Sequence, residues 1–151
     1  MIDKAKPVIA YVDGSCQNNP GPGGWGVYLK YGTAEKELFG SHKDTTNNRM
    51  EITAAIEALK SLTRPVYVII HTDSQYVVNA MTKWIYGWKT TNYKNNEVKN
   101  SELWKQLDEL CQVHTVEWKW VKGHCGNVGN ERADLLARKG TILAIKENKN
   151  V

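Results

Sequence analysis

The sequence predicts an α/β fold: a five-stranded mixed sheet, with three antiparallel and then two parallel strands, and helices on both faces. Two observations lead to this class. The chain opens with three β segments that have no helix between them, and its later β segments alternate with helices. Its 151 residues match the usual size of one domain. We therefore expect residues 1–151 to form a single domain.

The three opening segments predict an antiparallel meander. Residues 8–12 (VIAYV) are a short apolar run that ends at an Asp-Gly turn signal, which is typical of a buried strand. Residues 25–31 and 35–40 follow the glycine-rich loop NNPGPGG and are joined through Gly32 as a hairpin.

The middle of the chain predicts a helix and then a buried strand. Residues 48–62, which include MEITAAIEALKSL, have strong helical character, and Arg64-Pro65 ends this helix. Residues 66–71 (VYVIIH) are apolar throughout, as expected of a strand that is covered on both faces.

The remaining segments predict helix, loop and strand in turn. A helix over 74–89 is broken near Gly87 and leads into the loop TTNYKNNEVKN. A helix over 101–111 starts at a good N-cap, and 115–121 (TVEWKWV) alternates like a strand. The loop GHCGNVGN then leads into a last helix over about 131–145. The predicted order is β-β-β-α-β-α-α-β-α.

Composition argues against a membrane or secreted protein. No apolar run approaches the roughly 20 residues that a membrane-spanning helix needs, and the opening MIDKAKPVIA does not have the pattern of a signal peptide. The three cysteines are an odd number without the spacing of a disulfide framework, which favours a reducing compartment. We expect a cytoplasmic protein. Without a long heptad pattern or an extensive apolar stripe, we also expect a monomer.

The net charge of +4 is concentrated in the second half of the chain. Between Lys83 and Lys105, five lysines alternate with tyrosines and tryptophans. Basic residues mixed with aromatic ones suit a polyanion whose sugars or bases can be stacked upon. For this segment alone, a solvated charged face with ordinary core tryptophans is an equal alternative.

Two familiar kinds of site are not expected. The run GPGGWG matches a dinucleotide fingerprint, but a strand follows it where that mechanism needs a helix N-terminus. These glycines indicate a tight loop before the hairpin. The histidines and cysteines lack the spacing of a structural zinc site.

Four acidic residues are candidates for a site. Asp13 follows the first predicted strand and Asp73 follows the fourth. Glu51 shares a helical stripe with apolar residues, and Asp134 lies early in the last helix. Each acid has a separate structural explanation, as a turn former, a helix cap, a residue at the border of the core or a partner of the helix dipole.

A single arrangement would explain all four acids together. If the first and fourth strands are parallel neighbours, Asp13 and Asp73 emerge side by side, and two helices could bring in Glu51 and Asp134. Such carboxylates repel one another unless divalent cations neutralise them. Oxygen ligands alone select Mg²⁺, with Mn²⁺ as a possible substitute. Two ions roughly 4 Å apart can clamp an in-line phosphoryl displacement, so the pattern indicates a nuclease.

Four motifs, in this order and spacing, resemble those of the type 1 ribonuclease H family, which includes bacterial ribonuclease HI. They are DGSCQNNPGPGGWG, TTNNRMEITAAIEAL, HTDSQYV and WVKGHCGNVGNERADLLA. The match covers about 8–139, and the tail over 140–151 has no match and no assigned role. The resemblance implies a ribonuclease H-like fold. It also implies an endonuclease that hydrolyses the RNA strand of RNA–DNA hybrids with two Mg²⁺ ions, leaving 3′-hydroxyl and 5′-phosphate ends.

The resemblance also implies roles for individual residues. The family's metal-binding acids match Asp13, Glu51, Asp73 and Asp134, and its mobile-loop histidine matches His124. An imidazole titrates near neutral pH and could move a proton between the site and bulk water. From the sequence taken alone, an ordinary exposed loop histidine is the favoured interpretation of His124.

Substrate contacts are implied on both strands of the hybrid. The 2′-hydroxyls of the RNA strand are read in the minor groove, by positions that match Gly14, Cys16, Asn19, Asn47, Asn48 and Gln75. Thr46 matches a phosphate contact on the DNA strand. The family's basic protrusion, which grips that strand, matches Trp84, Trp88, Lys89, Lys94 and Lys99. The loop of this protrusion also carries Glu97 and has fewer cations than is typical of bacterial members.

Three competing interpretations remain. A DNA-cutting relative would share the sheet and the acids, and comparing cleavage of hybrid and DNA duplexes separates it. A hybrid-binding module without catalysis would show no turnover with Mg²⁺. In a plain α/β domain, the acids would be structural only.

Overall fold

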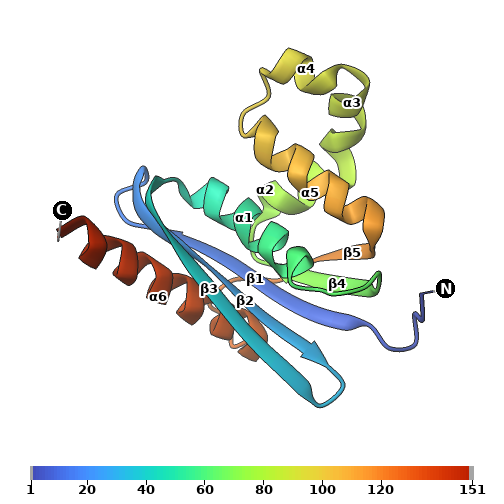
Figure 1. The fold of residues 1–151 in the computed structure, drawn as a ribbon, viewed down its shortest axis with the longest axis horizontal. Helices are drawn as coiled ribbons and strands as arrows, with labels where there is room; N and C mark the ends of the chain where they lie inside the picture. Colours follow the sequence, from blue (N-terminus) through green and yellow to red (C-terminus); the bar gives the residue numbers. More distant parts are fainter. Residues whose placement is uncertain (1, 150–151) are drawn as a thin grey trace.

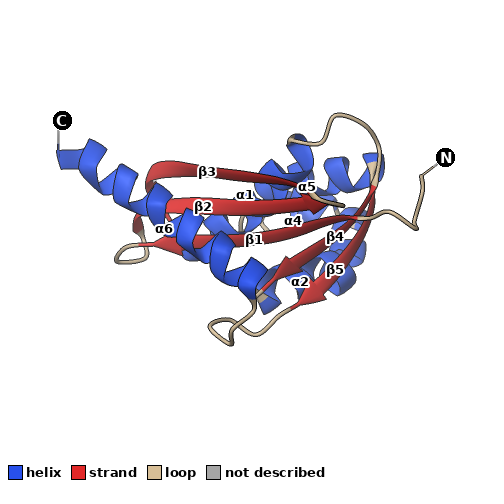
Figure 2. Ribbon diagram, turned by 90° about the horizontal axis from the view of Figure 1, so that it is seen from below, coloured by secondary structure: helices blue, strands red, loops and turns tan. Residues whose placement is uncertain are grey.

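The computed structural model describes residues 2–149 and contains one mixed sheet. The strand order is β3-β2-β1-β4-β5 (Figure 2). The strands are β1 (Val8–Cys16), β2 (Gly21–Tyr31), β3 (Ala34–Thr45), β4 (Tyr67–Thr72) and β5 (Thr115–Trp120). β1, β2 and β3 pair antiparallel, whereas β4 pairs parallel with both β1 and β5. The predicted fold class is confirmed.

Helices cover both faces of the sheet, as Figures 1 and 2 show. Long helix α6 (Val128–Lys149) packs on one face against β1, β2 and β3. The other helices lie on the opposite side of the sheet: α1 (Asn47–Lys60), α2 (Gln75–Asn79), π-helical segment η1 (Ala80–Trp84), α3 (Ile85–Thr90), α4 (Asn92–Asn96) and α5 (Ser101–Val113). None of the helices in residues 2–149 is long and apolar enough to cross a membrane.

The core lies between the sheet and α1. Ala10, Val12, Val68 and Ile70 from the central strands are at most 1% exposed, and they meet small alanines of α1. Thr46 caps this helix, since its Oγ1 accepts a hydrogen bond from the Arg49 N–H at 3.1 Å. The apolar run predicted for the fourth strand alternates between buried and half-buried side chains, because α6 does not extend over β4.

The run GPGGWG is part of β2 and not a loop before it, so that expectation was wrong. A Cβ atom at Gly24 would lie 2.4 Å from the Thr141 nitrogen, and one at Gly26 would lie 2.3 Å from the Ala133 oxygen. Glycine is required at these positions because the backbone of α6 rests directly on the backbone of β2. The glycines of this run therefore indicate close packing of α6 on β2 and not a turn.

The boundaries of several elements differ from the prediction. β1 continues four residues past Val12, so Asp13 pairs with Gly26 inside the sheet and does not form a turn. α6 begins at Val128 and runs to Lys149, so most of the unassigned tail is helix. Residues 150–151, the end of that tail, and residue 1 of the predicted domain lie outside the described residues.

The segment after β4 also differs from the prediction. Gly87 lies within α3 and does not break the helix. The departure from α-helical geometry comes earlier, at the π-helical segment η1. Next, α4 is left-handed, with φ between 49° and 67° over residues 92–96. Such backbone costs about 1–2 kcal/mol per ordinary residue. Asparagine tolerates it best, and three of these five residues are asparagines.

Candidate active site

Two of the predicted acids come from neighbouring parallel strands. Val12 of β1 pairs with Thr72 of β4, and Asp13 and Asp73 directly follow these two paired positions. Both therefore reach the same edge of the sheet, as the sequence predicted. Glu51 comes from the second turn of α1, which packs on β1, and it faces Asp13.

Three carboxylates form a compact cluster at this edge. One oxygen from each of Asp13, Glu51 and Asp73 lies within 4.8 Å of the other two. The Gly14 N–H donates to Asp13 Oδ1 at 2.9 Å and to Glu51 Oε1. A Cβ atom at Gly14 would lie 2.5 Å from the Glu51 nitrogen, so only glycine allows α1 to come this close.

Burial and neighbouring negative charges disfavour the ionised form of Asp13 and Glu51. Burial raises the pKa of Asp13 to about 7; the hydrogen bond with Glu51 opposes this rise, and the charges of Asp73 and Asp134 add to it. Burial and the neighbouring Asp13 raise the pKa of Glu51 as well. Within residues 2–149, no lysine, arginine or histidine forms an ion pair with the three clustered acids.

The donor set fits a hard divalent cation. Asp13 and Glu51 are only 5% and 7% exposed, and buried carboxylates cost stability unless a positive charge meets them. The available ligands are oxygens, which Mg²⁺, Ca²⁺ and Mn²⁺ prefer. The cluster could therefore hold a metal ion.

The fourth acid is turned partly away from the other three. Asp134 lines the same cavity, but its Oδ2 pairs with Arg138 Nη2 at 3.1 Å, one turn further along α6. It lies outside the group of mutually close ligand atoms. The side chain of Arg138 is 58% exposed, so this pair is a weak, solvent-screened restraint.

The acids stand in an open cavity of about 460 Å³. Its lining includes five other positions that the sequence singled out: Gly14, Asn47, Asn48, Gln75 and His124. His124 is exposed, with φ of 58°, on the loop before α6. Ser74 and Tyr76 also line the cavity, although the sequence did not indicate them. Their position beside Gln75, directly after the fourth strand, was the available signal.

Three further predicted contact residues lie beside this cavity. Asn19 Oδ1 accepts from the Asn47 N–H at 3.0 Å, which joins the loop after β1 to the start of α1. Thr46 precedes Asn47 as the cap of α1. The Cys16 thiol points toward the Thr45 oxygen at 3.4 Å, and burial raises its pKa. A thiol with a raised pKa is a poor nucleophile, which agrees with a contact role.

The basic aromatic segment combines both of its predicted alternatives. Trp104 is fully buried and packs against Trp88, with ring centroids 5.7 Å apart, so part of the segment is core. Trp84 is 42% exposed, and Lys94 and Lys99 are exposed. Lys89 is also exposed and pairs with Asp108 at 3.3 Å. We call residues 83–105 the basic protrusion, because α3 and α4 stand away from the sheet in Figure 1.

Comparisons with known proteins agree with this fold. A family profile described as RNase H matches residues 5–142. A ribonuclease H of Neisseria meningitidis is 59% identical over 137 residues, which cover 89% of this chain and 94% of that enzyme. The crystal structure of LC9-RNase H1 superimposes with a TM-score of 0.84 at 33% identity, covering 92% of this chain and 74% of that one. LC11-RNase H1, solved in complex with an RNA/DNA hybrid, has the same fold, with a TM-score of 0.69 at 23% identity; it covers 91% of this chain and 99% of that one.

The mixed sheet with acids at one edge and these relatives define a class of enzyme, the nucleases that hydrolyse phosphodiesters. Within that class, the chain belongs to the ribonuclease H family.

Proposed function

We propose that the protein is an endoribonuclease that hydrolyses the RNA strand of RNA–DNA hybrids and leaves 3′-hydroxyl and 5′-phosphate ends. The observation that carries this proposal is the cluster of Asp13, Glu51 and Asp73, which has oxygen ligands only and opens into a cavity of about 460 Å³. The ribonuclease H relatives support the same activity. A duplex can approach such an open cavity from solvent.

The carboxylates are the proposed metal ligands. Asp13, Glu51 and Asp73 would hold Mg²⁺, with Mn²⁺ as a substitute, and Asp134 would complete a site for two ions once it leaves Arg138. When bound, the ions would stabilise charge on the phosphate and lower the pKa of the attacking water. The acids themselves would then be ionised, because the cations offset the burial and the mutual repulsion that raise the pKa of Asp13 and Glu51.

Neutral groups beside the acids would recognise the RNA strand. The side chains of Asn47, Asn48 and Gln75 both donate and accept hydrogen bonds, as a 2′-hydroxyl does. The backbone of Gly14, the Cys16 side chain and Asn19 extend this surface along the start of α1. DNA offers no 2′-hydroxyl to these groups, so it would bind without being aligned for cleavage.

His124 is the proposed proton carrier. It is exposed and lines the cavity that contains the acids. An imidazole at this place can take a proton from bulk water and give it to the leaving oxygen. Its contribution would be to rate and not to binding, because it would transfer a proton and hold no part of the substrate in place.

The basic protrusion would hold the DNA strand. Lys94 and Lys99 are exposed and free to meet phosphates, and Trp84 offers an exposed ring to a sugar. Thr46 would contact a phosphate nearer the acids. Trp88 would support Trp84 by packing against it, since the two ring centroids lie 6.0 Å apart. Lys89 would have to exchange Asp108 for a phosphate.

The test is cleavage of an end-labelled RNA–DNA hybrid, with DNA and RNA duplexes of the same sequence as controls. We expect cleavage of the hybrid alone, in Mg²⁺ and not in EDTA, with product ends that a ligase accepts. Cleavage of the DNA duplex would point to the DNA-cutting alternative. Binding without cleavage in Mg²⁺ and in Mn²⁺ would leave a hybrid-binding module.

We also propose that the chain acts as one domain and as a monomer in the cytoplasm. The single continuous sheet supports the first part. A sedimentation measurement that finds a dimer at micromolar concentration would contradict the second.

A further inference from the structure

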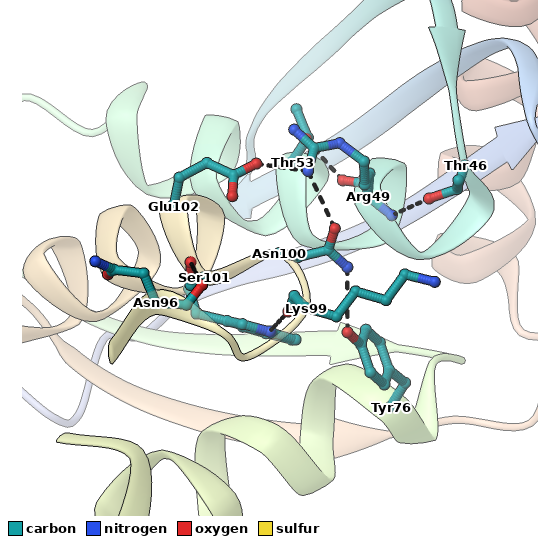
Figure 3. Close-up of polar contacts among 10 residues, drawn as sticks. Thr46, Arg49, Thr53, Tyr76, Asn96, Lys99, Asn100, Ser101 and Glu102 are labelled. Carbon is teal, nitrogen blue, oxygen red and sulfur yellow. Dashed lines mark hydrogen bonds and ion pairs between the residues drawn. The ribbon is translucent and has the colours of Figure 1, made fainter. Parts of the chain in front are cut away.

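A hydrogen-bonded network joins the active-site helix to the basic protrusion. Its members are Arg49 of α1, Tyr76 of α2, and Asn100 and Glu102 at the start of α5, and we call it the latch (Figure 3). These residues come from three helical regions, and Arg49 and Glu102 are 53 positions apart in the chain. None of the four was a candidate site residue in the sequence.

Arg49 is the centre of the latch. Its Nη1 donates to Asn100 Oδ1 at 3.0 Å and to Glu102 Oε1 at 2.5 Å. Asn100 Nδ2 then donates to the Tyr76 hydroxyl at 3.2 Å. The hydrogen bond from Arg49 lowers the pKa of Glu102. Arg49 therefore already has an anionic partner and is a poor candidate for a phosphate ligand of its own.

Asn100 is shaped for this connection and not for capping. It is 9% exposed and has φ of 65°. It precedes α5, but its side chain makes no capping hydrogen bond. An asparagine at the start of a helix normally caps it. Here both ends of the amide are committed to Arg49 and Tyr76, so the position serves contact between helices at the expense of the local cap.

Each end of the latch adjoins a different part of the proposed binding surface. Arg49 follows Asn48 and precedes Glu51 by two residues, in the first turns of α1. Tyr76 follows Gln75 and lines the cavity. Lys99, the last cation before α5, is the neighbour of Asn100, and its carbonyl accepts from Trp104 Nε1 at 3.2 Å.

We propose that Arg49 is a positioning residue: through Asn100, Tyr76 and Glu102 it fixes the basic protrusion relative to the carboxylates, so that one duplex meets both at once. This inference rests on the proposed function. A protrusion that moves independently of the carboxylates must be ordered each time substrate binds, and this loss of conformational entropy weakens the affinity. A protrusion that is already fixed does not have this cost.

The sign of the effect separates positioning from simple charge. Glu102 is an exposed acid within the basic protrusion, the segment that is proposed to meet the DNA strand. If only charge mattered, Glu102→Ala would strengthen substrate binding, because a repulsive charge is removed. If Arg49 positions the protrusion, Glu102→Ala weakens binding, because Arg49 loses its charged anchor.

The experiment compares steady-state cleavage of a hybrid by wild type, Glu102→Ala, Arg49→Met and the double variant at one salt concentration. We expect KM to rise about two- to fivefold in each single variant, because Glu102 is exposed and solvent screens its pair with Arg49. The double variant should be no worse than Arg49→Met, because both changes break the same contact. At saturating substrate, kcat should change by less than about twofold, since neither residue touches the reacting atoms.

The matched control is Glu97→Ala. Glu97 is an exposed acid of the same protrusion, and its side chain makes no hydrogen bond or ion pair with the described residues. Its removal should leave KM equal or lower. The inference is overturned if Glu102→Ala lowers KM as Glu97→Ala does, or if the effects of Arg49→Met and Glu102→Ala add.

A second measurement does not depend on cleavage. In both single variants, hydrogen exchange over residues 92–104 should become about tenfold faster than in wild type, while β4 keeps its protection. Unchanged exchange in the protrusion would refute the latch even if KM rises. A wild type that cleaves no hybrid would instead refute the proposed function, and the exchange measurement would still decide whether the latch exists.

Discussion

The burial of Asp13 beside other carboxylates leads to a quantitative prediction for Asp13→Asn. An asparagine has nearly the same shape, and its Oδ1 can still accept from the Gly14 N–H. Burial, chiefly, raises the pKa of Asp13 from 3.8 to about 7. Since one pKa unit corresponds to about 1.4 kcal/mol, ionising Asp13 in the metal-free protein costs up to about 4 kcal/mol.

The pH dependence follows from the sign of this shift. Between about pH 4 and pH 7, the native protein binds a proton at Asp13 that the unfolded chain has lost. The stability of wild type therefore falls as pH rises through this window, and Asp13→Asn does not share that loss. The variant should be about as stable as wild type below pH 4, and about 2–4 kcal/mol more stable above pH 7.

The assay is urea unfolding in EDTA at several pH values, with Asp44→Asn as the control for an exposed acid. In a parallel thermal unfolding measurement at pH 8, the same gain should raise Tm by about 4–16 °C for a chain of this size. Adding Mg²⁺ should reduce the difference, because the ion stabilises only the protein that binds it. Equal stability differences at pH 4 and pH 8, or a less stable variant at pH 8, would refute the reasoning. Despite its stability, the variant should lose cleavage by orders of magnitude.

Four other variants test separate parts of the molecule. Replacing Lys94 and Lys99 by alanine should weaken hybrid binding for all sequences and lower the slope of log affinity against log salt by about 0.7–0.9 per lost phosphate contact; an unchanged slope would move the grip on DNA elsewhere. His124→Ala should lower kcat by no more than about 10²–10⁴-fold at nearly constant KM, whereas a mainly raised KM would make it a binding residue. Gly87→Ala, where a Cβ meets nothing within 4 Å, should stabilise α3 by about 0.5–1 kcal/mol in thermal unfolding. Gly26→Ala should unfold or strongly destabilise the protein, since its Cβ would lie 2.3 Å from the Ala133 oxygen; similar stabilities of the two variants would contradict the packing of α6 on β2.

The sequence by itself determined the sheet and three members of the acidic cluster. Apolar runs and turn signals are local features, and short connections allow few ways to pair the strands that they define. Once β1 and β4 are parallel neighbours, Asp13 and Asp73 must lie side by side. Glu51 could be included because a carboxylate on an apolar helical stripe has few other stable surroundings.

Only the tertiary structure decided which residues of distant elements contact one another, because the sequence of one element does not indicate its partner. Arg49 and Glu102 are 53 residues apart, and nothing near either residue indicates its partner. Asp134 carries the residue type of a ligand, yet it pairs with Arg138 one turn away and lies outside the cluster. The glycines of β2 resembled a loop because their need for space comes from α6, more than 100 residues later. Periodicity records how a segment meets water or core, but the identity of a neighbour depends on the whole packed arrangement.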